Sequence, residues 1–275
     1  MRTLMMIVIP ILLLSYGCSD DKQNPTAPEN PNGIPFDVLR RKIADQAISI
    51  FENGTTVLRY DYIENIHDGR GYTAGRAGFT TATCDLLEVV TRYTTVVPSN
   101  PLATFIPRLQ VLCNTADSSV SGLDNLPMAW KNAASDSTFR KIQDTVVDEF
   151  YYNPAVQHAK DLKLKFPLSL LNIYDACIQH GNGNDPDGVP AMITKATSLA
   201  GGSPSGGADE KIWLDKFMIV RRNTLLNPFN QRTKDAWAQS VDRVDAFRGI
   251  YNGQNFYLKE KVKLTIWSTD FYLPE

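Results

Sequence analysis

The sequence is poor in the residues that bind metals and in the motifs that bind nucleotides. It has three histidines and four cysteines among 275 residues, and neither set has the spacing of metal ligands. It contains no glycine-rich phosphate loop and no strand–turn–helix signature around a nucleophilic serine. We therefore expect no metal and no other cofactor, and we look for chemistry that side chains perform alone.

The chain also lacks an excess of charge of either sign. It has 28 Lys and Arg against 30 Asp and Glu, a formal net charge of −2. Without a basic excess, a nucleic-acid partner is not expected. Five acidic side chains do gather in one part of the sequence, where they would either give a cleft a negative potential that attracts cations or form an ordinary solvated face. They are Asp61, Glu64, Asp68, Asp85 and Glu88.

Long hydrophobic runs are missing except at the N-terminus. The run Leu4–Leu14 is too short to span a bilayer permanently. We predict that residues 1–17 are a signal peptide and that the protein is secreted. Cys18 follows in the manner of a bacterial lipoprotein cleavage site, although Ser15 stands where an aliphatic residue is usual. Two alternatives remain open: a lipid anchor on Cys18, which we favour, or a plain secretory signal with an incidental cysteine.

Both alternatives place the protein outside the cytoplasm, and they differ in whether a lipid attaches it to a membrane. We expect an extracellular protein or a cell-surface lipoprotein of a bacterium, with the lipid on Cys18 as the only link to a membrane. Residues 18–34 are rich in proline and asparagine, so we predict that they form the anchor and a flexible tether. Residues 35–275 are enough for one domain with a sizeable core, which two lobes can share, and we expect a monomer.

Residues 51–73 contain two carboxylates in contrasting settings. Apolar residues recur at helical spacing before this stretch, and an Asn-Gly pair predicts the helix end, which puts Glu52 in the last turn. The helix dipole and the apolar neighbours there disfavour its charged form. Asp68 lies in a glycine-flanked loop where water and Arg70 keep it ionised. Such a pair suits acid/base cleavage of a glycosidic bond, although from spacing alone an ordinary helix-end glutamate and turn aspartate are the commoner explanation.

This stretch and several later ones resemble the secreted bacterial chitosanases of glycoside hydrolase family 46. The matching phrases keep the family's order from about Asp37 nearly to the C-terminus. They are Glu52-Asn53, Tyr62–Ile66, Asp68–Thr73, Gly78-Phe79, Asp85–Val90, Tyr174-Asp175, His180-Gly181, Gly183–Pro186 and Arg243–Asp245. The resemblance implies a mainly α, lysozyme-like two-lobed α+β fold with a substrate cleft between the lobes.

The resemblance also implies roles for the residues at matching positions. Glu52 would be the general acid, Asp68 the general base and Thr73 the residue that helps to hold the attacking water. His180, at the end of a core helix, is either a substrate contact or a helix-end histidine bonded to the backbone. The other positions that would line the sugar subsites are Tyr62, Arg70, Thr83 and Asp85.

Asp175 calls for a partner, because it lies in an apolar helix predicted over residues 167–180 and a buried lone carboxylate is costly. The resemblance implies two such partners, Arg221 and Arg243, in a structural network that joins the lobes. We also expect Thr83 to cap a helix that carries Asp85 in its first turn, where the helix N-terminus stabilises the anion.

The cysteines and the C-terminal segment give three smaller predictions. If Cys18 is lipidated, Cys84 and Cys113 are the pair to test for a disulfide. Cys177 lies inside the core helix and is expected to stay a buried thiol. Alternating apolar residues in 262–266 predict a short strand pair.

Together, the residues and the resemblance predict an endo-acting, inverting glycoside hydrolase that cleaves β-1,4 linkages between glucosamine units in chitosan or its oligosaccharides. One rival is a lysozyme-like enzyme that acts on peptidoglycan or chitin. The other is a surface glycan-binding lipoprotein without catalysis, against which the joint presence of Glu52, Asp68 and Thr73 argues.

Overall fold

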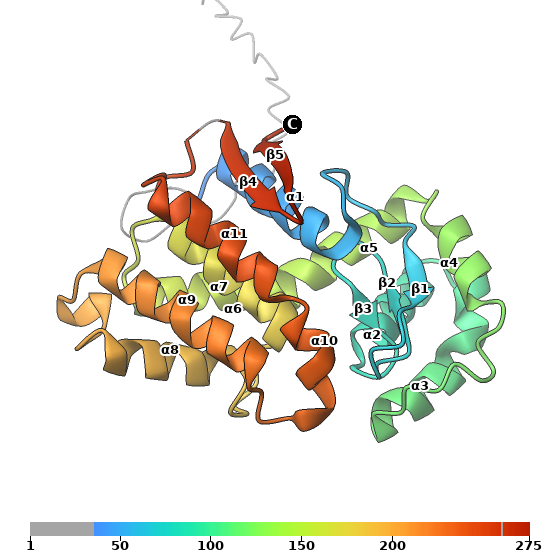
Figure 1. The fold of residues 1–275 in the computed structure, drawn as a ribbon. Helices are drawn as coiled ribbons and strands as arrows, with labels where there is room; N and C mark the ends of the chain where they lie inside the picture. The colour runs from blue at the N-terminus through green and yellow to red at the C-terminus, as the bar shows by residue number, and fades with distance from the viewer. Residues whose placement is uncertain (1–35, 260) are drawn as a thin grey trace, which may run out of the picture.

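The protein is described by a computed structural model that covers residues 36–259 and 261–275 (Figure 1). The predicted signal peptide, Cys18 and the predicted tether lie outside the described residues. Within the described part of the chain, none of the helices has the length and apolar character needed to cross a membrane.

The predicted mainly helical fold is confirmed, and its elements form two groups that we call the small and the large lobe (Figure 1). The small lobe contains β1 (Ile63–Asn65), β2 (Tyr72–Ala74), β3 (Phe79–Thr80), α2 (Asp85–Val96), η1 (Pro101–Phe105), α3 (Ile106–Thr115), α4 (Leu126–Ala133) and α5 (Ser137–Val147). The large lobe contains α6 (Asn153–Asp161), α7 (Pro167–His180), α8 (Val189–Leu199), η3 (Pro204–Gly206), α9 (Glu210–Leu226), η4 (Gln231–Thr233), α10 (Lys234–Ala238), α11 (Val241–Asn252), β4 (Val262–Ile266) and β5 (Thr269–Leu273).

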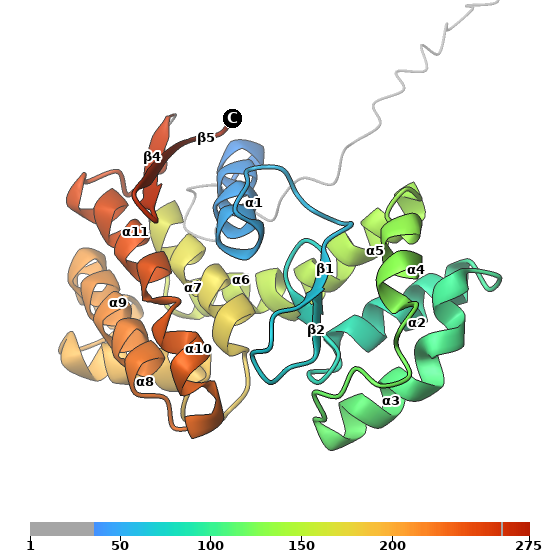
Figure 2. The same cartoon turned by 45° about the vertical axis from the view of Figure 1, so that its right-hand side comes forward.

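Helix α1 (Val38–Asn53) lies between the lobes and delivers Glu52 in its last turn (Figure 2). Asp37 caps its start by accepting a hydrogen bond from the Arg40 backbone N–H at 2.9 Å. Gly54 ends it in the left-handed conformation, with φ of 69°, and donates its N–H to the Ile50 carbonyl. The predicted helix stop is therefore confirmed.

Helix α7 is the centre of the large lobe. Nearly all of its residues are buried, because α1, α6, α8, α9 and α11 pack around it. This surrounds Asp175 with protein on every side, as the apolar character of the sequence predicted. Polar groups are sparse in such a core and must be paired with one another.

A long helical segment connects the two lobes. Helix α5 packs on α2 in the small lobe, α6 packs on α7 in the large lobe, and between them lies the π-helical turn η2 (Asp148–Tyr152). Pro154 explains that turn, because it cannot donate a hydrogen bond to the carbonyl four residues before it and its ring crowds that carbonyl. The widened turn carries Tyr151 into the space between the lobes.

The small sheet fixes the position of Thr73. Strands β1, β2 and β3 pair antiparallel in that order, with Glu64 opposite Thr73 and Thr73 opposite Thr80. Thr73 is therefore on the central strand and buried. The predicted C-terminal strand pair is also confirmed as β4 and β5, which pair antiparallel from Val262 opposite Leu273.

The predicted disulfide is confirmed between Cys84 and Cys113, which lie 29 residues apart. It ties the start of α2 to α3 within the small lobe. Cys177 is a buried free thiol, also as predicted. The predicted cap is wrong: the backbone of Cys84 turns through φ of 73°, so α2 begins at Asp85 and Thr83 lies outside it.

We predict that the disulfide stabilises the folded protein by about 2–4 kcal/mol, because it lowers the conformational entropy of the unfolded chain. The test is urea unfolding of the native protein and of the double variant Cys84→Ser/Cys113→Ser. Reductant should lower the midpoint of the native protein towards that of the variant and leave the variant unchanged. Coincident midpoints without reductant would contradict the prediction.

Candidate active site

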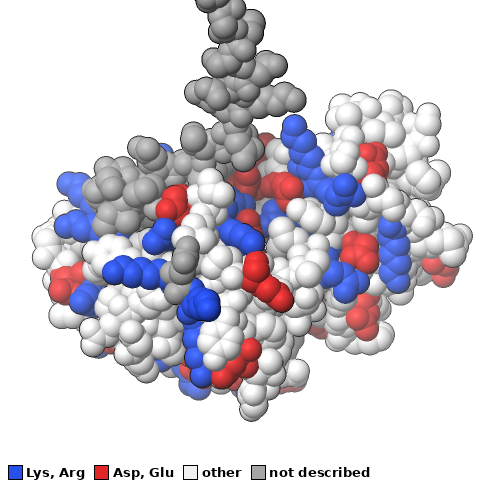
Figure 3. Space-filling view, turned by 90° about the horizontal axis from the view of Figure 1, so that it is seen from above, with Lys and Arg blue, Asp and Glu red and all other residues white. Residues whose placement is uncertain are grey.

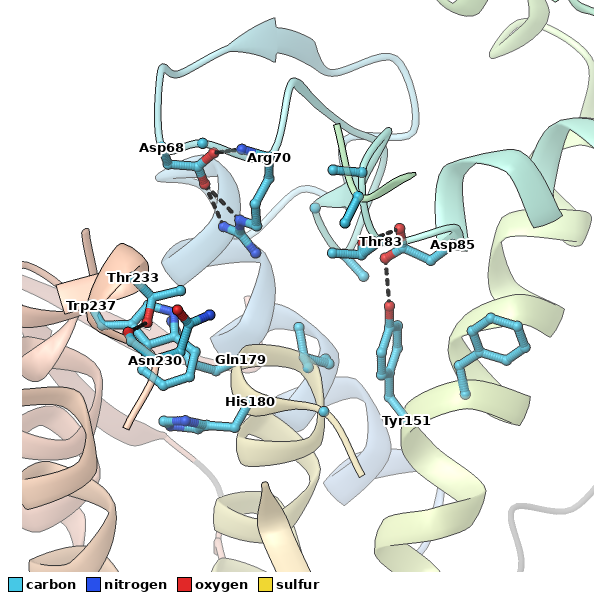
Figure 4. Close-up of a pocket in the computed structure, with 18 of the residues that line it drawn as sticks. Asp68, Arg70, Thr83, Asp85, Tyr151, Gln179, His180, Asn230, Thr233 and Trp237 are labelled. Atoms are coloured by element: carbon cyan, nitrogen blue, oxygen red, sulfur yellow. Dashed lines mark hydrogen bonds and ion pairs between the residues drawn. The ribbon is translucent and has the colours of Figure 1, made fainter. Parts of the chain in front are cut away.

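A cavity of about 890 Å³ lies between the lobes and has residues of both in its wall (Figure 4). In the small lobe, the cavity is lined by the loop of Asp68 to Arg70, the β2–β3 turn and the start of α2. In the large lobe, it is lined by the C-terminal end of α7 and the segment from Asn230 to Trp237. The face of the molecule seen in Figure 3 has both basic and acidic side chains, and neither sign of charge covers it.

Glu52 lies beside this cavity, behind the β2–β3 turn. Its side chain is 16% exposed, and its Oε1 accepts a hydrogen bond from Arg243 Nη1 at 2.7 Å. Its Oε2 points at Gly78: a Cβ on Gly78 would lie 2.7 Å from that oxygen. The arginine contact and the close approach to Gly78 together fix the position of the Glu52 carboxyl.

Thr73, on the small sheet, also lies next to Gly78. A Cβ on Gly78 would lie 3.5 Å from Thr73 Cγ2, so the threonine and the Glu52 carboxyl flank one glycine. Its buried hydroxyl has no hydrogen-bond partner among the described residues. Because buried polar groups are usually paired, this hydroxyl is available to a water or a substrate.

Asp68 lies in the loop between β1 and β2, and Arg70 holds it. The Arg70 backbone N–H donates to Oδ1 at 3.0 Å, and Nε and Nη2 lie 2.7 and 2.6 Å from Oδ2. This is the partner that the sequence led us to expect. Gly71 has φ of 80° and passes so close to Thr81 that a Cβ would lie 2.1 Å from its hydroxyl oxygen, so only glycine closes this loop.

Asp85 begins α2 and is held by four donors. Its Oδ1 accepts from the backbone N–H groups of Thr80 and Leu86 at 2.8 and 2.9 Å, and from the Thr83 hydroxyl at 2.8 Å. Its Oδ2 accepts from the Tyr151 hydroxyl at 2.8 Å, which links the acid to the turn between the lobes. Burial raises the pKa of Asp85 from its ordinary value, although these hydrogen bonds act in the opposite direction.

Tyr62 differs from the other expected subsite residues, because it does not line this cavity. Its hydroxyl donates to Glu64 Oε2 at 3.3 Å. Burial raises the pKa of Tyr62 to about 12, with further contributions from the negative charges of Glu64, Glu52 and Asp68. The side chain therefore lies within electrostatic reach of both candidate catalytic acids.

Behind Glu52, a buried ion network joins three more elements. Asp175 on α7 is fully buried and accepts from Arg221 Nη2 on α9 at 2.5 Å and from Arg243 Nη2 on α11 at 2.6 Å. Burial acts to raise the pKa of Asp175, but the charges of Arg243 and Arg221 outweigh it and hold the pKa below its ordinary value. Arg243 thus binds Asp175 and Glu52 at once, and it also lies over the Phe51 ring at 5.0 Å.

His180 is at the C-terminal end of α7 and lines the cavity. It is 8% exposed, its ring packs edge-on against Trp237 at 4.7 Å between centroids, and neither ring nitrogen has a partner among the described residues. The alternative of a helix-end histidine bonded to the backbone is therefore wrong. Burial, followed by the charges of Arg221 and Arg243, lowers the pKa of His180 well below its ordinary value, so the ring is neutral.

The acidic cluster expected from the sequence is only partly at the cavity. Asp68 and Asp85 line it, whereas Asp61 pairs with Arg59, Glu88 pairs with Arg92, and Glu64 lies on β1. The sequence reasoning missed many lining residues, and four of them have chemistry that bears on the site. They are Asp117, Tyr151, Gln179 and Trp237. The described residues contain no group of three or more His, Cys, Asp or Glu that is arranged to hold a metal.

Comparison with known proteins gives one family. The profile of Glycosyl hydrolase family 46 matches residues 46–262. A chitosanase of Bacillus subtilis (strain 168) is 48% identical over 226 residues, which are 82% of this chain and 81% of the relative. A chitosanase of Nocardioides sp. (strain N106) is 34% identical over 238 residues, which are 86% of this chain and 82% of the relative.

Solved structures agree with these relatives. A Gynuella sunshinyii GH46 chitosanase in complex with chitotetraose has a TM-score of 0.85 and 46% identity, and the match covers 86% of this chain and 98% of that one. A mutant chitosanase of Bacillus subtilis MY002 in complex with six GlcN units has a TM-score of 0.84 and 44% identity, with the same two coverages.

We predict that Asp175→Asn lowers the free energy of unfolding by about 3–5 kcal/mol at pH 7, because it leaves two buried guanidinium groups without their shared anion. Since the folded pKa of Asp175 lies below the unfolded value, its contribution is present above the unfolded pKa and is lost as pH falls through the folded pKa. The difference between native protein and variant should therefore shrink below about pH 4.

Urea unfolding at pH 7, 5, 4 and 3 checks this. The matched control is Asp245→Asn on α11, whose exposed ion pair with Arg222 should contribute less than about 1 kcal/mol. Equal losses in the two variants would contradict the role of the buried network.

Proposed function

Because the chain belongs to glycosyl hydrolase family 46, we propose that it is a chitosanase: a glycosidase that cleaves β-1,4 linkages between glucosamine units inside chitosan chains, with inversion at the anomeric carbon. The observation that carries the proposal is a pair of carboxyl groups at one cleft: Asp68 lines it from the small lobe, and Glu52, at the end of α1, lies against the lining residue Gly78. The relatives named as chitosanases, and the solved complexes with chitotetraose and with six GlcN units, support this substrate.

We assign the proton donor to Glu52 and the base to Asp68. Glu52 protonates the glycosidic oxygen as the bond to the anomeric carbon breaks. Asp68 removes a proton from a water that attacks the anomeric carbon from the opposite face. This geometry needs room for the water, and in inverting glycosidases the two carboxyl groups are about 6.5–9.5 Å apart.

Three neighbouring residues support this chemistry. The free hydroxyl of Thr73 beside Glu52 is a suitable group to hold the attacking water. Arg70 holds the Asp68 carboxylate in place through its side chain and its backbone N–H. Arg243 binds the Glu52 carboxylate that remains after proton donation, and it holds the carboxyl in place between cycles.

Substrate binding is proposed for both lobes. In this proposal Asp85 and its partner Thr83 bind a sugar ammonium group, and Arg70 and His180 contact neighbouring sugars. Tyr62 contacts a sugar near Glu52 and Asp68. A cleft with carboxylates attracts a polycation, which also favours chitosan over neutral glycans.

The remaining predictions concern the whole protein. We propose that it is secreted, that it acts outside the cell as a monomer, and that residues 18–34 tether the domain to a lipid on Cys18. Mass spectrometry of the mature protein reads this directly, since a lipid on Cys18 adds a defined mass and a plain signal peptidase product lacks it. The joint presence of Glu52, Asp68 and Thr73 argues against a glycan-binding protein without catalysis.

Glu52→Gln should lower the rate of reducing-end release from fully deacetylated chitosan by about 10²–10⁴-fold, because glutamine cannot donate the proton. Binding of chitosan oligosaccharides should remain, as measured by calorimetry. The control is Glu149→Gln, which removes an exposed partner of Arg92 outside the cavity lining and should keep full activity. A normal rate in Glu52→Gln would refute the assignment, and a native protein inactive on this polymer but active on peptidoglycan would refute the substrate.

Gly78→Ala should lower kcat by about 10²-fold with a smaller change in KM, because the added methyl displaces the Glu52 carboxyl from its position. Part of any effect is backbone strain, since Gly78 has φ of 66°. Gly207→Ala separates backbone strain from displacement of the carboxyl, because Gly207 has φ of 97° but open space where a Cβ would lie. This control should lose stability and keep its kcat, and equal kcat values in the two variants would contradict the positioning role.

A further inference from the structure

The two walls of the cleft differ in charge. Asp68, Asp85 and Asp117, the carboxylates that line the cavity, all come from the small lobe, and we call this side the acidic wall. The large lobe contributes Gln179, His180, Asn182, Asn230, Thr233 and Trp237, which we call the neutral wall (Figure 4). Among the described lining residues, this side contains no Asp, Glu, Lys or Arg.

Two side chains of the neutral wall, Gln179 and His180, have polar atoms without partners among the described residues. Among the described residues, Gln179 Oε1 and both ring nitrogens of His180 are buried with no hydrogen-bond partner. Such groups are nearly always satisfied in a working protein, so a ligand is the expected partner here. Together, one neutral imidazole and one amide offer a donor and an acceptor, and the Trp237 ring beside them offers an apolar surface.

The stereochemistry of the polymer determines which wall the C2 group of each sugar faces. In an extended β-1,4-linked chain, each unit is turned by about half a revolution relative to its neighbours. The substituents on C2 therefore point alternately to one side and to the other. In a cleft with two walls, every second C2 group faces the acidic wall and the groups between face the neutral wall.

An acetamide and an ammonium group suit different walls. An ammonium on C2 is stabilised by the buried Asp85 or the exposed Asp117, whereas an acetamide there would leave the carboxylate without a cation. On the neutral wall an ammonium gains no counter-charge. An acetamide there finds an acceptor for its N–H, a donor for its carbonyl and an aromatic ring for its methyl group.

We propose that the enzyme tolerates N-acetylglucosamine at every second position of the bound chain, where C2 faces the neutral wall, and requires glucosamine at the positions between. The inference rests on the proposed function and adds a pattern of acetylation to it. Gln179, His180 and Trp237 are then the residues that determine this specificity on the neutral wall.

The test is digestion of randomly and partially acetylated chitosan, followed by mass-spectrometric sequencing of both ends of the products. The acetylated fraction should alternate between low and high from one position to the next, counted from the cleaved bond. A fraction that is uniform, or that rises steadily away from the cleaved bond, would overturn the proposal. Fully deacetylated hexamer serves as the reference, since failure to cleave it would refute the proposed function and this inference together.

A single substitution sharpens the test. Gln179→Glu keeps the shape of the side chain and adds a carboxylate to the neutral wall, so acetylation at the tolerated positions should fall by about tenfold relative to the native enzyme. Cleavage of the hexamer is measured for each variant, so that the ratio reports selectivity. The matched control is Gln110→Glu on α3, an exposed position outside the cavity lining, which should keep the native pattern. An unchanged pattern in Gln179→Glu would overturn the assignment to this wall.

Discussion

The ion pair between Arg243 and Glu52 is the contact on which the site depends. Arg243 comes from α11 and Glu52 from α1, 191 residues apart in the chain, and the arginine is itself held by Asp175 in the core of the large lobe. Two guanidinium groups and two carboxylates balance one another, which offsets the cost of their burial. Glu52, the proposed acid, is thus tied to the central, most deeply buried helix of the large lobe.

Asp68, the proposed base, is supported differently from Glu52, and the difference follows from the fold. Asp68 lies in a loop of the small lobe, held by its neighbour Arg70 and by a glycine that passes against Thr81. The lobes are joined by α1 and by the helical segment that includes the π turn, from which Tyr151 reaches Asp85. A change in the angle between the lobes would move Asp68 relative to Glu52 while each side chain keeps its own contacts.

Much of this arrangement could be predicted from local sequence. The helix that ends at Gly54, the core character of α7, the disulfide and the C-terminal strand pair each follow from residues that are close in sequence or from simple pairing rules. The resemblance added the two arginines beside Asp175. Contacts between distant segments were missed, because no local pattern shows that Arg243 also reaches Glu52 or that Tyr151 meets Asp85. The start of α2 was placed wrongly because a positive φ at Cys84 is not visible in the sequence.

The central claim is that Glu52 and Asp68 act on opposite faces of one sugar through a single water. Proton NMR of glucosamine hexamer during hydrolysis tests it most directly, because it resolves the anomers before mutarotation mixes them. The new reducing ends should appear first as the α-anomer, since one displacement inverts a β linkage. First appearance of the β-anomer would mean a retained configuration and would contradict it.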